Sequence, residues 1–433
     1  MKVLIVGAGI SGLYSAYLLE RVGIEVEIFE ASNRVGGRIL SVEDDNGDFS
    51  ELGAEVVYAP QAPLMKLLKK LNISLRRYNE LSYFYYKRTL YSENQLHHSK
   101  SLNAVIQAID DIEDYKGAET SLTEYIRSLP FYNSEMDELV NAFACEYGTT
   151  AQNIDVKSLA FEETQWQGGE DEFCCQQPLN AVWQYFQDNI HCNVYLNTQV
   201  KSITCLDNGI SITDQNNHIS FGDKVLVSVN LGILKSKDIQ FTPPLPTNTL
   251  QAIDGIGIDA GLKIVMKFGS RWWPDDLMTI EGGSICNEYL ASRNYDSPAL
   301  TGFIMGEKLK DVSSLSTESL TSQLLAELNK IFSHSMATTT FVSSQLKNWG
   351  DDEFHKGAYS YASRNSPSMR SALSESIDNK LFFIGEACNT NGHAATIHGA
   401  METAEKVVKK LSVELKARKK PVELSEHHNW IKV

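Results

Sequence analysis

This 433-residue sequence has few of the features that mark membrane, metal-binding or disulfide-rich proteins. No stretch approaches the ~20 apolar residues that span a bilayer, and an expected strand begins at Lys2 without a charged-then-apolar leader. The seven cysteines are too scattered for a metal site, and their odd number does not suggest a disulfide framework. We therefore expect a cytoplasmic protein in a reducing environment, with no membrane attachment and no metal.

Basic residues are also in deficit, since 39 Lys and Arg stand against 55 Asp and Glu, which gives a formal net charge of −16. Nucleic-acid binding needs a concentrated basic surface that displaces counterions from phosphates, so we exclude nucleic-acid partners. A cationic substrate suits the acidic charge better, although such charge can also serve solubility alone. No spacing typical of a zinc site or a P-loop is present.

The N-terminal segment reads as a βαβ unit. An apolar run at 3–6 precedes a glycine-rich turn, a helical spacing of apolar residues at 13–22 and a second apolar run at 26–29. The first glycine turns the chain, the second lets backbone approach a pyrophosphate, and the third packs helix on strand. Glu30 ends the second strand, where a carboxylate can accept from ribose hydroxyls. A dinucleotide site is predicted from Gly7, Gly9, Ile10, Ser11, Gly12 and Glu30.

The residues directly after this acid extend the predicted dinucleotide site. Ala31, Arg34, Gly37 and Arg38 supply two guanidinium groups and a paired glycine where the chain can wrap a diphosphate. Here the sequence resembles the flavin amine oxidases, the family of monoamine, polyamine and L-amino-acid oxidases and histone lysine demethylases. Further motifs follow in the family's order at 51–55, 227–235, 241–246, 383–387 and 395–400.

The resemblance spans nearly the whole chain and implies an α/β fold, with a Rossmann-like FAD-binding domain and a mixed α+β substrate domain. It implies that the segments at 385–386 and 396–397 hold the ribityl-phosphate and pyrimidine edge of FAD, and that Val200 holds adenine through its backbone. Backbone donors there would stabilise the negative charge of a reduced flavin. The other cofactor-binding residues implied are Gly53, Ala54, Glu55, Trp349, Gly385, Glu386, Thr396, Ile397 and Ala400.

The residues that would face the substrate and the flavin ring are predicted mainly through the resemblance. Lys263 lies on an alternating strand at 262–268, where a lysine alone is most often exposed. The family's flavin-facing lysine, which holds a water near flavin N5, falls on Lys263, and its charge could guide oxygen. Tyr359 matches an aromatic wall of the substrate cage, where the ring face can orient an amine by cation–π attraction. Thr396 falls where monoamine oxidases place a second tyrosine, as in polyamine oxidases and demethylases.

Departures from the family narrow the expectation. Ala358 replaces the cysteine to which monoamine oxidases attach their cofactor, so we expect noncovalent FAD. Glu55 and Val56 stand where L-amino-acid oxidases usually have a carboxylate-binding arginine, and 177–179 reads Gln-Pro-Leu where paired glycines are common. The chain also lacks the long helical insertion and N-terminal module of the histone demethylases, which argues against a chromatin role.

The expected function is an amine oxidase acting on a small polyamine-like primary or secondary amine, with hydride transfer to flavin N5 and reoxidation by O2 to hydrogen peroxide. Glu55 and the acidic residues at 170–172 would suit a substrate's spare ammonium groups, although such a cluster is also typical of a solvated turn. Alternatives are an L-amino-acid oxidase or biosynthetic flavin oxidase, for which Arg271 or Arg364 could bind a carboxylate, and a non-catalytic flavoprotein.

The expected domains are discontinuous, and the length exceeds the ~250–300 residues at which single cores stop growing. Residues 1–78, 192–246 and 376–415 are assigned to the FAD-binding domain, with 79–191 and 247–375 forming the substrate domain. A mixed-charge, mobile tail is expected at 416–433. A capping box at Ser121 and Glu124, a hairpin around 207–209 and a last helix at about 396–411 are also predicted. The oligomeric state is open, and a homodimer is one option.

Overall fold

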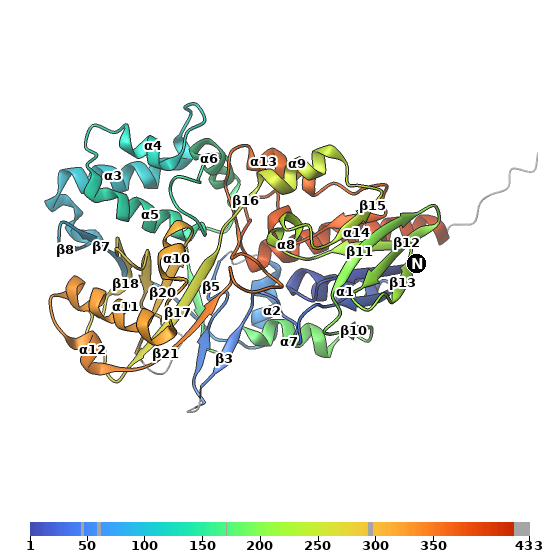
Figure 1. Cartoon of the computed structure of the whole chain (residues 1–433), viewed down its shortest axis with the longest axis horizontal. Helices are drawn as coiled ribbons and strands as arrows, with labels where there is room; N and C mark the ends of the chain where they lie inside the picture. Colours follow the sequence, from blue (N-terminus) through green and yellow to red (C-terminus); the bar gives the residue numbers. More distant parts are fainter. Residues whose placement is uncertain (45–46, 59–61, 170, 293–297, 420–433) are drawn as a thin grey trace, which may run out of the picture.

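A computed structural model describes residues 1–44, 47–58, 62–169, 171–292 and 298–419. Its two main sheets lie toward opposite ends of the long axis (Figure 1). Five parallel strands form the first sheet, which confirms the α/β architecture. Their spatial order is β10 (Asn193–Tyr195), β2 (Glu25–Phe29), β1 (Lys2–Val6), β14 (Lys224–Val227) and β23 (Leu381–Phe383).

Helices bury this parallel sheet, as the continuous apolar runs of its strands require. The N-terminal helix packs along the C-terminal helix, with Leu19 and Met401 fully buried in the shared core. The helices against this core are α1 (Ile10–Arg21), α2 (Pro63–Lys70), α7 (Asn180–Asp188) and α14 (Ile397–Lys419). Residues more than 350 positions apart in the sequence therefore lie side by side in one layer.

A four-stranded sheet packs near the other face of the parallel sheet, where Ile203 and Ile212 share a core with Val225. Its order is β13 (Ile219–Gly222), β12 (Gly209–Asp214), β11 (Val200–Leu206) and β15 (Gln240–Thr242). The predicted hairpin is confirmed, because β11 and β12 pair antiparallel on either side of the turn. Helices α8 (Leu231–Lys235), α9 (Thr247–Gly255) and α13 (Ser366–Leu373) follow nearby.

The second main sheet has seven strands, mostly antiparallel. Ile264 and Met266 of its strand β17 pack against Leu324 and Leu328 of helix α11, which covers one face. Its order is β21 (Phe341–Asn348), β17 (Gly261–Phe268), β20 (Ala299–Met305), β19 (Glu288–Leu290), β18 (Leu277–Glu281), β7 (Leu81–Tyr86) and β8 (Thr89–Ser92). Beside it lie α10 (Glu307–Val312), α11 (Thr317–Phe332) and α12 (Met336–Thr340).

A helical layer packs over one end of this sheet (Figure 1). The capping box at Ser121 and Glu124 is confirmed, since each side chain accepts from the other's backbone N–H. The layer contains α3 (Lys100–Asp110), α4 (Leu122–Arg127), α5 (Asp137–Glu146) and α6 (Val156–Gln165), with 3-10 turns at Glu93–His98, Asp111–Asp114 and Ser134–Met136. Three small sheets complete the fold of the described residues. Two of them have two strands each: β3 (Ser41–Glu43) with β4 (Phe49–Glu51), and β16 (Gly257–Ile258) with β22 (Ser360–Tyr361). In the third, β9 (Phe173–Cys175) lies between β5 (Val56–Val57) and β6 (Leu75–Arg77).

The C-terminal end differs from the expectation of a tail from residue 416. Helix α14 continues to Lys419, because apolar Val407, Val408 and Leu411 keep one of its faces in the core of the parallel sheet. Residues 420–433 lie outside the described part of the chain. Within the described part, no helix is both long and apolar enough to cross a bilayer. The domain boundaries given above stay a prediction.

Candidate active site

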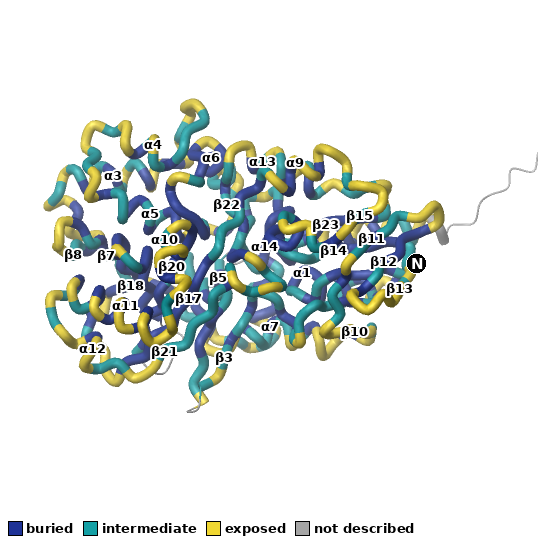
Figure 2. The backbone as a smooth tube through the Cα atoms, viewed as in Figure 1, coloured by how far each residue is buried: buried dark blue, intermediate teal, exposed yellow. Residues whose placement is uncertain are grey.

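A cavity of about 860 Å³ lies between the parallel sheet and the seven-stranded sheet. Strands β1, β2, β14 and β23 line one side, and β17, β19 and β20 line the other. Figure 2 shows how the chain around these strands is buried, with exposed segments mainly at the periphery. The volume falls in the range of cofactor and ligand sites, and all but two of the predicted site residues line the cavity. The exceptions are Gly12 and Arg34.

The glycine turn presents backbone to the cavity. Gly7 has φ +102°, which favours glycine, and no heavy atom lies within 4 Å of a Cβ built on Gly9. Helix α1 begins without a side-chain cap, so its first N–H groups are free for an anion in front of Gly9. A Cβ on Gly12 would lie 2.1 Å from the Gly7 carbonyl oxygen, which explains why Gly12 serves packing and does not face the cavity. The turn therefore fits a diphosphate.

Glu30 directly follows β2 at the edge of the cavity, so the strand ends one residue before the predicted end. Its Oε2 accepts from the Ala8 N–H at 2.6 Å, and its Oε1 accepts from the N–H and hydroxyl of Ser32 at 2.9 and 2.8 Å. A carboxylate has about four acceptor positions, so these three bonds fix its orientation and leave capacity for a ribose hydroxyl.

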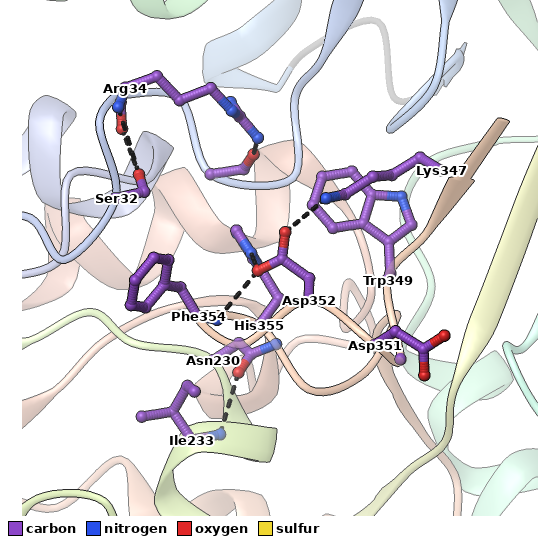
Figure 3. A network of polar contacts seen from close by, with 12 residues as sticks. Ser32, Arg34, Asn230, Ile233, Lys347, Trp349, Asp351, Asp352, Phe354 and His355 are labelled. Atoms are coloured by element: carbon purple, nitrogen blue, oxygen red, sulfur yellow. Dashed lines mark hydrogen bonds and ion pairs between the residues drawn. The ribbon is translucent and has the colours of Figure 1, made fainter. Parts of the chain in front are cut away.

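The two predicted guanidinium groups have different places. Arg34 donates to the carbonyls of Val35, Gly37 and Ile39 at 3.1, 2.6 and 3.4 Å, so it holds the shape of its own loop (Figure 3). Arg38 lines the cavity, donates to the Ala358 carbonyl at 2.6 Å and pairs with Glu386 at 3.0 Å. Of the two, Arg38 is the one placed to meet a phosphate.

A polar network beside this loop supports Trp349, which lines the cavity (Figure 3). Asp352 accepts from Lys347 at 2.5 Å and from the Phe354 N–H at 3.0 Å, and it contacts His355 Nδ1 at 2.8 Å. Burial opposes the charge, but the bonds from His355 and Lys347 hold the pKa of Asp352 well below its usual value. The ring of His355 meets Trp349 edge-on at 4.9 Å, and the indole donates to the Leu52 carbonyl at 2.9 Å.

The C-terminal motif joins the cavity through two backbone features. Gly385 has φ +128°, and the nearest atom to a Cβ built there is Ser11 Oγ at 3.9 Å, which leaves open space. Thr396 caps α14, because its hydroxyl accepts from the Gly399 N–H at 2.9 Å and donates to the His393 carbonyl at 2.8 Å. The positive end of the α14 dipole therefore meets the cavity at Ile397, where the pyrimidine edge is expected.

Glu386 ties these elements together. Its carboxylate accepts from the Ser360 hydroxyl at 2.6 Å and the Ala395 N–H at 3.0 Å, in addition to Arg38. Burial raises its pKa, but the charges of Arg38 and Arg370 and the Ser360 bond outweigh it, so the pKa of Glu386 lies below its usual value. An ionised carboxylate is thus fixed at the junction of three distant segments.

Lys263 is buried, with 3% exposure, and lines the cavity. Strand alternation alone favours an exposed lysine, but here both faces of β17 are covered: one by α11 and the other by the segment at 52–55. Its Nζ lies 2.6 Å from Glu55 Oε2, donates to the Gly53 carbonyl at 2.9 Å and sits 5.3 Å from the ring centre of Phe303. Glu55 therefore forms an ion pair with Lys263 and is not a free carboxylate for a polycation.

Tyr359 also lines the cavity, with its hydroxyl donating to the carbonyls of Cys145 and Glu146 at 3.3 and 3.2 Å. Two further aromatic residues on the cavity, Tyr58 and Trp166, meet edge-on at 5.7 Å. Sequence reasoning missed both, although Tyr58 closely follows the motif at 51–55, which could have directed attention to it. They add aromatic side chains to the cavity lining besides Tyr359.

The arginines of the rival interpretation lie elsewhere. Arg271 pairs with Asp275 at 3.5 Å and Arg364 pairs with Glu119 at 2.5 Å, and neither lines the cavity. Arg77 does line it, but pairs with Asp171 at 2.6 Å. Of the predicted acidic cluster, Glu172 reaches the cavity, Asp171 does not, and Glu170 lies outside the described residues.

A family model described as flavin containing amine oxidoreductase matches residues 10–411. The chain belongs to this family. It is 26% identical to lysine-specific histone demethylase 1 homolog 2 of Arabidopsis thaliana over 98% of this chain and 60% of that protein. It is 24% identical to probable polyamine oxidase 4 of the same plant over 92% of this chain and 84% of that protein.

The chain thus spans about half to 60% of the length of the demethylase homologues that it matches. Among solved structures, a putrescine oxidase with bound putrescine superposes with a TM-score of 0.81 at 20% identity, covering 95% of this chain and 99% of that one. This likeness confirms the fold. The family is flavin-containing, and the open glycine turn together with the uncapped α1 N-terminus fits such a cofactor.

Proposed function

We propose that this chain is an FAD-dependent amine oxidase that oxidises the C–N bond of a primary or secondary, polyamine-like amine and passes electrons to O2. The observation that carries the proposal is the buried Lys263 on the wall of the cavity that Tyr359 and the uncapped N-terminus of α1 also line. Similarity to polyamine oxidases and to the fold of putrescine oxidase supports this substrate class.

Bound FAD would supply the hydride acceptor and, after reduction, the electrons that convert O2 to hydrogen peroxide. The residues proposed to hold its phosphates and ribose are Gly9, the α1 N-terminus, Glu30 and Arg38, with Ile397 and Ala400 at its other end. Position 358 carries a methyl group, so no thiol is present there to bond the cofactor. Binding is therefore noncovalent in this proposal.

The substrate must lose a proton before it can lose hydride. For an amine of pKa ~10, that deprotonation costs about 4 kcal/mol at pH 7. The rings of Tyr359 and Tyr58 can hold the arriving cation by their faces, and the enclosed cavity then favours the neutral amine by removing water. Lys263 supplies a fixed positive charge where oxygen would gain electrons.

The test is a visible spectrum of the purified protein, before and after incubation with FAD, followed by peroxide assays. We expect a flavin spectrum and peroxide with putrescine or spermidine, at rates above those for tyramine, tryptamine and L-amino acids. A protein that stays colourless with excess FAD contradicts the proposal, and peroxide only with L-amino acids replaces the substrate class.

A second candidate is oxidation of a methylated lysine side chain, because the demethylase homologues match 92–98% of this chain. Methyl-lysine is a secondary or tertiary amine, so the same cavity chemistry applies. A dimethyl-lysine peptide therefore joins the assay panel, and formaldehyde release from it, with no peroxide from free polyamines, would favour this candidate.

A further inference from the structure

Arg370 of α13 is a buried cation that lies outside every sequence motif named above. It is 2% exposed, and a charge at such a position is costly unless it is paired and hydrogen-bonded. Its Nε donates to Glu162 of α6 at 2.9 Å. Its Nη1 donates to the Ser360 hydroxyl at 2.6 Å and to the Ala387 carbonyl at 3.2 Å. Arg370 therefore joins the helical layer to β22 and to the turn after β23.

Ser360 carries this contact onward to the flavin side of the cavity. A guanidinium can only donate, so the Ser360 oxygen accepts from Arg370 and its single proton goes to Glu386, 2.6 Å away. The Ser360 N–H also donates to Glu386, at 3.3 Å. Glu386 in turn pairs with Arg38, the guanidinium that is placed to meet a phosphate. One line of hydrogen bonds thus runs from α6 through these side chains to Arg38.

The charges along this line support one another. Burial opposes the charge on Glu386, and its pKa lies below the usual value because the charges of Arg38 and Arg370 and a hydrogen bond outweigh burial. Two further titratable groups interact with this carboxylate, Cys388 and Tyr359, and burial raises the pKa of each, so both are neutral at pH 7. Arg370 therefore supplies part of the positive charge that keeps Glu386 ionised.

We propose, on the basis of the function proposed above, that Arg370 is a positioning residue for the cofactor, which holds Ser360 and Glu386 in the arrangement that keeps Arg38 at the diphosphate. Arg370 does not line the main cavity as the structure describes it, but a neighbouring one of about 350 Å³. Its effect on the cofactor must therefore pass through Ser360 and Glu386.

The experiment titrates FAD into flavin-free protein at pH 6, 7 and 8, with the dissociation constant read from the flavin fluorescence. Arg370→Met occupies a similar space without the charge. The ratio of its dissociation constant to that of wild type should be about 10 at pH 8 and about 100 at pH 6. The ratio should grow because Glu386 without Arg370 takes up a proton as the pH falls, and a protonated carboxyl group no longer holds Arg38.

Two variants separate charge from packing. Arg370→Lys keeps the charge and loses the fork of donors, so FAD binding should weaken by the same factor at all three pH values. Arg364→Met is the matched control, because Arg364 is exposed, lies six residues earlier and pairs with Glu119. It should bind FAD within about twofold of wild type.

Arg370→Met leaves Glu162 without its cation, which could prevent folding. The double variant with Glu162→Gln removes that unpaired acid and should show the same growing ratio. Ser360→Ala breaks the line while Arg370 stays in place, and it should also weaken FAD binding. A ratio that is equal at all pH values in Arg370→Met, or wild-type affinity in Ser360→Ala, would overturn the positioning role and leave the proposed function intact. A wild-type protein that binds no FAD, or whose bound flavin no amine reduces, would overturn the proposed function itself.

Discussion

The two sides of the cavity present different kinds of chemical group, mainly backbone on one side and side chains on the other. On the cofactor side, much of the cavity surface is backbone: the turn at Gly7 and Gly9, the uncapped start of α1 and the capped start of α14, with the side chains of Glu30 and Arg38 beside them. On the substrate side they come from side chains, with Lys263 and Glu288 in one cross-strand row. Backbone sites tolerate few residue types, whereas a row of side chains can change its chemistry one position at a time. The comparison associates cofactor binding with the backbone-rich side and substrate specificity with the side that carries the row of side chains.

The difference extends to charge. On the cofactor side, Glu386 has a partner in Arg38 that helps to keep it ionised. On the substrate side, Glu288 and Glu146 have no such partner among the described residues, and burial favours their neutral forms. The charge of Glu386 on the cofactor side is balanced without a ligand. Glu288 and Glu146 on the substrate side would have a compensating charge only beside a bound cation.

The largest effect is expected from a pair of glycine substitutions on the cofactor side. Gly12→Ala places a methyl group 2.1 Å from the Gly7 carbonyl oxygen, so α1 must move away from its strand. We expect a loss of stability of about 3 kcal/mol or more and no bound flavin. Gly9→Ala meets open space at φ −67°, so the fold should persist while FAD binding weakens.

Thermal unfolding and the flavin absorbance of the purified proteins separate the two glycine variants. Gly12→Ala should lower the melting temperature of FAD-free protein, and Gly9→Ala should not. Full flavin content in Gly9→Ala would show that the space in front of this residue does not hold the diphosphate.

A second, smaller effect tests the reacting side at Lys263. Lys263→Met leaves Glu55 buried without its cation, which should cost up to about 3 kcal/mol of stability, less where Glu55 takes up a proton. Flavin should stay bound, and reoxidation by O2 should slow because a positive charge is lost near the site of electron transfer. Stopped-flow mixing of reduced protein with O2 measures this step.

The double variant Lys263→Met with Glu55→Gln is the control for the unpaired acid. It should regain most of the stability and keep the slow oxygen step. An unchanged oxygen rate in both variants would remove Lys263 from the proposed oxidase chemistry.

Much of the cofactor side could be predicted from sequence, because its signals are contiguous. The glycine turn and Glu30 lie within one βαβ unit, and each has a physical reason that holds in any such unit. Arg34 shows the limit of this reasoning. The sequence places a guanidinium near the diphosphate loop. It does not show that, in the folded loop, this guanidinium already donates its hydrogen bonds to backbone carbonyls.

The substrate side could be predicted only in part. Lys263 and Tyr359 were found through the family resemblance, whereas the sequence pattern around Lys263 alone favours exposure. Glu288 and Tyr58 were missed because their position depends on strand register and on packing between segments far apart in the chain. Strands β17 and β19 both pair with β20, which lies between them. No spacing in the sequence therefore predicts that Lys263 and Glu288 lie on the same face of the sheet.

The smallest effect is a pH dependence of stability that the Glu288 carboxyl group on the substrate side should contribute. The pKa of Glu288 is about 8 in the folded protein, against 4.5 as its ordinary value, with burial first and then Glu281, Glu172 and Glu55 raising it and Lys263 lowering it. Between these values the folded state keeps a proton that the unfolded state has lost, so stability falls as pH rises.

We expect a fall of up to about 1.4 kcal/mol between pH 6 and pH 7 from the Glu288 carboxyl group. Urea unfolding at equal flavin saturation should show the Glu288→Gln variant gaining on wild type across this interval, because a glutamine side chain releases no proton. Glu318→Gln should run parallel to wild type, since its carboxylate is exposed. If Glu288→Gln also runs parallel, Glu288 is already ionised at pH 6, and the contrast between the two sides of the cavity then rests on geometry and not on charge.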